Sequence, residues 1–190
     1  SDVCSSDLMA FWANVSGGQV LVANAGPATG TCALTTWLRT YTPFQDLSST
    51  ATCTAAATYV GNAVTAATAL NATGNARLKG YALATALSVY FSDPVLGGNL
   101  LSAPSPIGAV PIDTTTMATD TGGTFGAPYV DVSSVFGGSR GPTVLQMLSS
   151  TSVQSNAGGS TWYGNVAGTQ QLAIGAFDAV SNQAAFRKVQ

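Results

Sequence analysis

Residues 77–92 form the stretch RLKGYALATALSVYFS. Its apolar side chains fall on nearly every side of a helix, and a helix that is apolar all round is a buried one. We therefore expect a helix over residues 77–92 at the centre of the fold, ended by Asp93 and Pro94 because proline cannot continue it. Arg77 and Lys79 lie in its first turn, where their charged tips are expected to reach solvent.

Helical patterns also occur on both sides of this stretch. Between Thr54 and Leu70 the apolar residues form one stripe, and the many alanines together with Gly61 predict a close approach to the central helix. A turn at residues 71–74 separates the two helices. Further helices are expected at residues 31–40, from Pro142 onwards, and from a cap at Ser160 or Thr161 to about Phe186.

Residues 94–141 differ in character from the rest of the chain. Prolines and glycines recur in this segment, which disfavours helix. Two stretches rich in β-branched residues, Pro111–Met117 and Tyr129–Phe136, are expected to pair as an irregular two-stranded insert that leans on the helices. The predicted fold class is therefore mainly α: a single-core helical domain with a β-rich, Pro/Gly-rich insert at about residues 94–141.

The first eight residues, SDVCSSDL, match the in-frame translation of a common sequencing adapter. We therefore expect residues 1–8 to be an artefact, and residues 9–190 to form one mainly helical domain, a fragment of a longer protein. Without Asp2 and Asp7, the eight acidic residues fall to six, and these balance the six basic residues.

The composition excludes several classes of function. The 190 residues contain no histidine and no glutamate, and only 7% of them are charged. The usual general base and the commonest metal ligand are therefore missing. A few scattered basic residues form no stripe for phosphate contacts, so we expect no nucleic-acid partner. No run of apolar residues is long enough for membrane insertion. A surface rich in Thr, Ser and Asn is typical of secreted bacterial proteins.

Two cysteines, Cys32 and Cys53, remain once Cys4 is set aside with the adapter. An even pair in a secreted protein favours a disulfide. The alternative is a pair of small buried thiols. Metal binding by these two thiols is disfavoured, because no histidine is present to complete a site.

Three aspartates are candidates for a metal or catalytic site. Asp113 and Asp131 occur in similar settings, and if their strands pair, the two carboxylates lie near each other with Asp120 in the connecting loop. Such a cluster of oxygens can bind Ca²⁺, although the spacing of an EF-hand is missing. The same pair could serve as the acid and base of a glycosidase. The alternative is that these aspartates cap backbone turns.

The aromatic residues offer a surface on which a sugar can stack. The candidates are Trp12, Trp37, Trp162, Tyr41, Tyr59, Tyr129 and Tyr163. Trp37 has helical neighbours Leu34 and Leu38, which indicates the core. Trp162 and Tyr163 follow a glycine pair and are the better candidates for an exposed ligand-binding pair. A hydrophobic staple at a helix start is the alternative for both.

Several stretches occur in a distinctive order and spacing: Phe11-Trp12, Gly18–Val22, Ala33–Leu38, Tyr81–Tyr90 and Ser160–Asn165. Together they resemble an uncharacterised domain found near the C-terminus of large secreted bacterial surface proteins, often after immunoglobulin-like or other extracellular repeats. The resemblance brings no functional residues with it. It implies an extracellular or cell-surface location, with upstream domains of the same chain as partners.

These observations predict a non-enzymatic extracellular module, structural or adhesive, of a bacterial surface protein, with no cofactor unless Ca²⁺ is bound. One alternative is a domain that binds a surface glycan or protein through exposed Trp162 and Tyr163. The second alternative is a hydrolase built on Asp113 and Asp131.

Overall fold

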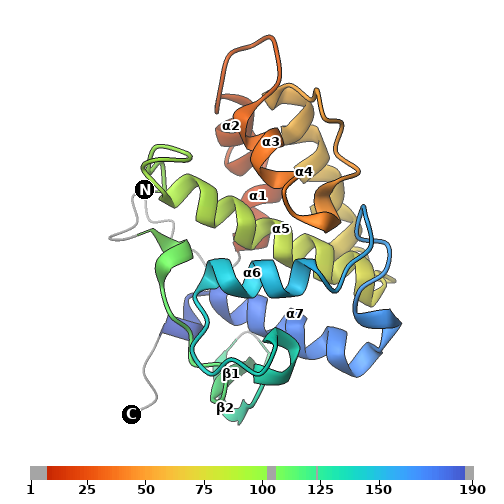
Figure 1. Ribbon diagram of the computed structural model, residues 1–190, viewed down its shortest axis with the longest axis vertical. Coiled ribbons are helices and arrows are strands. Elements are labelled where there is room, and N and C mark those ends of the chain that lie inside the picture. Colours follow the sequence, from red (N-terminus) through yellow and green to blue (C-terminus); the bar gives the residue numbers. More distant parts are fainter. Residues whose placement is uncertain (1–7, 102–105, 123, 187–190) are drawn as a thin grey trace.

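The computed structural model describes residues 8–101, 106–122 and 124–186, and it is mainly α-helical (Figure 1). The α-helices within these residues are α1 (Leu8–Ala13), α2 (Gly18–Ala23), α3 (Ala33–Leu38), α4 (Cys53–Thr68), α5 (Gly74–Ser92), α6 (Val144–Ser152) and α7 (Ala167–Ser181). The strands are β1 (Met117–Asp120) and β2 (Phe125–Val130). Short 3₁₀ turns are η1 (Thr42–Phe44), η2 (Ile107–Ala109), η3 (Ser133–Phe136), η4 (Tyr163–Asn165) and η5 (Ala184–Phe186).

Helix α5 crosses the middle of the molecule, with α2, α3 and α4 on one side and α6, α7 and the strands on the other (Figure 1). Every residue from Ala82 to Ser92 is buried, so the prediction of a buried helix at residues 77–92 is confirmed. The helix begins at Gly74, earlier than predicted. Its first turn is capped by Thr73, whose side chain accepts a hydrogen bond from the backbone N–H of Ala76.

Helices α4 and α5 approach each other closely at Gly80. A Cβ atom added there would lie 2.3 Å from the Cβ of Ala67, which leaves no room for any side chain. The prediction that Gly61 faces α5 is wrong. A Cβ atom at Gly61 would instead meet the side chain of Gln19, in α2, at 2.6 Å.

The two later helices begin at other residues than predicted. Thr143 and Gln146 form a capping box at the start of α6, so this helix begins just after Pro142 rather than on it. Helix α7 begins only at Ala167, not at Ser160 or Thr161. The backbone of Tyr163, Gly164 and Asn165 has positive φ angles of 49°, 58° and 63°, which a right-handed helix cannot contain.

The strands pair antiparallel, with Met117 opposite Val130 and a bulge between Ala118 and Thr119. The predicted strands at Pro111–Met117 and Tyr129–Phe136 are therefore wrong in position, although the pair does lie within residues 94–141. A turn capped by Asp113 bends the first segment before β1, and the second segment continues from β2 into η3. The strand pair packs against α7.

Cys32 and Cys53 form a disulfide, with their Cα atoms 4.9 Å apart. Both residues are buried, and the bond joins the residue before α3 to the first residue of α4. The predicted pairing is confirmed. No helix among the described residues combines the length and the apolar character that a membrane crossing requires.

Candidate functional site

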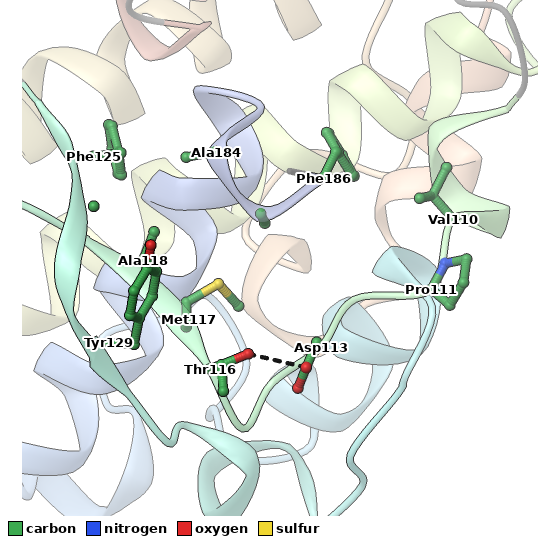
Figure 2. Close-up of a pocket in the computed structure, with 12 residues that line it drawn as sticks. Val110, Pro111, Asp113, Thr116, Met117, Ala118, Phe125, Tyr129, Ala184 and Phe186 are labelled. Carbon is green, nitrogen blue, oxygen red and sulfur yellow. Dashed lines mark hydrogen bonds between the residues drawn. The ribbon is translucent and has the colours of Figure 1, made fainter. Parts of the chain in front are cut away.

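A cavity of about 450 Å³ opens beside the strand pair (Figure 2). Its walls come from residues 110–118, from β2 and from η5. The larger apolar side chains that line it are Val110, Pro111, Met117, Phe125, Tyr129 and Phe186. Asp113 brings a carboxylate to this mostly apolar lining, and Figure 2 shows it across the cavity from Tyr129. We call this space the Asp113 cavity.

The turn after Asp113 holds its carboxylate in place. Oδ1 accepts hydrogen bonds from the backbone N–H of Thr115 at 2.9 Å and from its hydroxyl at 2.6 Å. Oδ2 accepts a bond from the hydroxyl of Thr116 at 2.9 Å (Figure 2). These bonds, with the side chain of Thr115 foremost, lower the pKa of Asp113 below its ordinary value. The group is exposed, and it is ionised at neutral pH.

Thr114 anchors this turn to the body of the protein. Its side chain is buried, and its hydroxyl donates to the carbonyl oxygen of Ser139 at 2.6 Å. Its backbone N–H donates to the carbonyl of Arg140 and its own carbonyl accepts from the N–H of Val132. Two other segments, at Val132 and at Ser139-Arg140, therefore fix the backbone that carries Asp113.

Asp131 lies close enough to Asp113 for their charges to interact, so the structure does bring together two of the predicted site residues. Hydrogen bonds from Ser133, with its side chain foremost, lower the pKa of Asp131, and Arg140 adds to this. The charge of Asp113 acts in the opposite direction and is outweighed. Both aspartates accept backbone N–H bonds two residues ahead, which is how aspartate caps a turn.

Asp120 does not join this pair in a metal site. It lies at the end of β1 and lines a different cavity, of about 340 Å³, together with Arg77 and Asp178. Within the part of the chain that the structure describes, no three acidic, histidine or cysteine residues are grouped so that they could hold a metal ion. The predicted Ca²⁺ site of Asp113, Asp120 and Asp131 is therefore wrong.

Aromatic rings form much of the wall of the Asp113 cavity. Phe125 and Tyr129 both come from β2, and Phe186 comes from η5 (Figure 2). The Tyr129 side chain is 46% exposed, and Met117 between these walls is buried. Tyr129 was one of several aromatic candidates in the sequence, but nothing in the sequence singled it out, because its exposure depends on the edge of a short strand pair.

The prediction that Trp162 and Tyr163 form an exposed ligand-binding pair is wrong for Trp162. Its side chain is 0% exposed, and its Nε1–H donates to the carbonyl of Gly159 at 2.9 Å. Its backbone N–H donates to Asn75 Oδ1, and this hydrogen bond connects Trp162 to the first turn of α5. Tyr163 is half-buried, and its hydroxyl donates to the carbonyl of Val135 at 2.7 Å. Both residues join segments of the fold.

A second cavity, of about 440 Å³, contains an ion pair that the sequence did not reveal. Lys79 Nζ lies 2.5 Å from Asp46 Oδ2 and donates to the carbonyl of Gly158 at 2.8 Å. The hydroxyl of Tyr59 donates to Asp46 Oδ1 at 2.6 Å, and the Lys79 nitrogen lies 5.2 Å from the centre of the Tyr59 ring.

Burial of Tyr59, reinforced by the charge and hydrogen bond of Asp46, raises the pKa of the phenol. The side chain of Lys79 is 15% exposed, so the prediction that its tip reaches solvent is wrong. We call this group of residues the Asp46 cluster. It joins the loop before α4 to α4, α5 and the turn at Gly158.

Comparisons of the chain with models of known protein families, with curated proteins and with solved structures give no match.

Proposed function

We propose that the chain is a non-enzymatic extracellular module, structural or adhesive, of a bacterial surface protein, and that it corresponds to the uncharacterised C-terminal domain that it resembles. The observation that carries this proposal is the buried Cys32–Cys53 disulfide. Disulfides persist in oxidising compartments and are rare in the cytosol, where thiols are kept reduced. The proposed domain has one core that includes α5, with residues 94–141 as an insert.

The state of the acidic residues supports a non-enzymatic role. A glycosidase needs one carboxyl group with a raised pKa to protonate the leaving group. Asp113 and Asp131 both have pKa values held below the ordinary range by hydrogen bonds. Neither group would be protonated at neutral pH, and the chain has no histidine or glutamate that could act as the general acid instead.

A second candidate function is ligand binding, and the Asp113 cavity favours it. Binding sites for small ligands are concave, mostly apolar and equipped with a few polar groups that fix orientation. The cavity of about 450 Å³ with one carboxylate among apolar side chains has this composition. Tyr129, rather than Trp162, would be the exposed aromatic residue of such a site.

The location can be tested with a Cys4→Ser chain that is expressed once with an export signal and once without it. We expect no free thiol after denaturation of the exported protein and two free thiols in the cytosolic one. Two free thiols in both preparations would overturn the extracellular assignment.

The non-enzymatic role needs a separate assay. The exported protein and an Asp113→Asn, Asp131→Asn double variant are compared on a panel of glycosides and peptides, and we expect turnover by neither. Turnover by the wild type that the double variant lacks would establish the hydrolase instead.

A further inference from the structure

We propose that the Asp113 cavity binds a quaternary alkylammonium group. The carboxylate of Asp113 would face the positive charge, and Phe125, Tyr129 and Phe186 would contact the alkyl groups. This inference rests on the binding role proposed above and gives that role a ligand chemistry. Three features support it: the negative charge of Asp113, the aromatic and apolar side chains of the lining, and the small number of polar side chains there that could pair with a ligand.

Among the described residues, no cation forms an ion pair with the carboxylate of Asp113. Its oxygens accept bonds only from the neutral donors of Thr115 and Thr116. Within the described residues, the ion pair of Lys79 with Asp46 involves no atom of this site, and no basic side chain lies within salt-bridge distance of Asp113. Asp131 adds a second negative charge nearby, and Arg140, which interacts with Asp131, offsets part of that second charge. The potential at this edge of the cavity therefore favours a cation.

The walls favour a cation with an apolar surface. Aromatic faces attract positive charge through the ring quadrupole, and they recognise quaternary ammonium groups in particular. Phe125 and Tyr129 on one side and Phe186 on another supply such rings (Figure 2). Met117 and Pro111 extend the apolar surface that methyl groups would contact.

The available hydrogen bonds distinguish this ligand from two others. A sugar presents many hydroxyl groups, but the polar side chains of the lining are those of Asp113, Thr116 and Tyr129, and the hydroxyl of Thr116 already donates to Asp113. A primary ammonium group needs three acceptors, and among the described residues of the lining Asp113 alone has a carboxylate. A quaternary ammonium group needs none. It is therefore the cation whose burial here leaves the fewest polar groups unpaired.

The test is a titration of the ¹⁵N-labelled, oxidised protein with choline chloride, followed by NMR. Parallel titrations use 3,3-dimethylbutan-1-ol, which has the same shape but no charge, and methylammonium chloride. We expect saturable shifts at the amides of Thr115, Thr116 and β2 with choline, and at least about fivefold weaker binding of the neutral analogue. Methylammonium, which needs three acceptors and has less apolar surface, should also bind more weakly than choline.

Two variants complete the test. Asp113→Asn should weaken choline binding about tenfold, and Tyr129→Ala should weaken it about threefold. Asp131→Asn removes the same charge from a neighbouring residue that does not line the cavity, and it should have the smaller effect. The dispersion of the amide signals shows whether each variant is folded.

Three outcomes would overturn the proposal: equal binding of choline and its neutral analogue, unchanged binding by Asp113→Asn, or no shift with choline. A further titration with a soluble glycan and a short peptide shows whether the cavity binds another ligand when it does not bind a quaternary ammonium group. Shifts at the same amides with either probe would leave the binding role standing with another ligand. No shift with any probe would remove the binding role as well, whereas the extracellular assignment depends on the thiol count alone.

Discussion

Asp46 and Asp113 are both exposed aspartates beside cavities of similar volume, about 440 and 450 Å³, but their surroundings differ in kind. Asp46 meets a lysine and a tyrosine from neighbouring helices, so its charge is matched within the fold. Among the described residues, the hydrogen-bond partners of the Asp113 carboxylate are the threonines of its own turn. The comparison teaches that one carboxylate of this protein connects its parts, while the other is held ionised and open to a partner from outside.

The largest expected effect concerns the loop that carries Asp46. This loop is closed by the Cys32–Cys53 bond, whereas the Asp113 cavity lies outside it. Replacing both cysteines with alanine should lower the free energy of unfolding by about 3 kcal/mol. Urea unfolding followed by tryptophan fluorescence measures this, and the reduced wild type is the control. Choline binding should persist in this variant. Its loss would show that the Asp113 cavity depends on the disulfide-closed loop.

The next effect follows from removing the cation of the Asp46 cluster. Lys79→Met removes the cation that pairs with Asp46 and the donor that binds the carbonyl of Gly158, while the hydrogen bond from Tyr59 to Asp46 remains. Because Asp46 is 43% exposed, we expect a loss of about 2 kcal/mol in the free energy of unfolding, below the value for a fully buried pair. Arg77→Met removes a charge from the same turn of α5 and should cost less. Equal losses in the two variants would mean that the cluster adds no stability of its own.

Thr114→Val tests how firmly the turn that carries Asp113 is anchored. This change removes the buried hydroxyl that donates to Ser139, and the unpaired carbonyl should cost about 1 kcal/mol of unfolding free energy. The turn of Asp113 should loosen, so choline binding should weaken as well. Thr54→Val, at an exposed position of α4, is the matched control. Full choline affinity in Thr114→Val would show that the turn needs no anchor.

The smallest effect is on the pH dependence of stability. The pKa of Asp113 is lower in the folded state than its ordinary value of 3.8, so the unfolded chain binds the proton first as the pH falls. The stability from this group is therefore present above pH 3.8 and is lost as the pH falls through the folded pKa. Melting temperatures measured from about pH 5 to pH 2 should fall less steeply in Asp113→Asn than in the wild type. Parallel curves would show that the turn does not favour the ionised form.

Features that depend on neighbours along the chain could be predicted from the sequence. The all-round apolar pattern of residues 77–92 predicted a buried helix because a helix places those side chains on every side. The even number of cysteines after Cys4 predicted the disulfide. The alternative for Asp113 and Asp131, that they cap turns, also needed only local sequence, since their partners lie within three residues.

Features that depend on distant segments could not be predicted. Lys79 is joined to Asp46 and to Gly158, which lie 33 and 79 residues away, and no local pattern marks either contact. Trp162 is buried because Asn75, 87 residues earlier, binds its backbone. The strands were misplaced because β-branched residues also occur in the turn at Thr114–Thr116 and in η3, where hydrogen bonds to other segments determine the backbone.

The position of the disulfide has a mechanical consequence. If the two ends of the chain are pulled apart, the segment between Cys32 and Cys53, which are 21 positions apart, cannot extend while the bond is intact. A fully stretched segment of this length would span about 70 Å. The chain therefore lengthens by about 70 Å less on unfolding while the bond is intact. The loop of Asp46, and with it the attachment of Lys79, bears no tension along the backbone. A module under load would therefore extend only through the segments before Cys32 and after Cys53, and the latter include the strands and the Asp113 cavity.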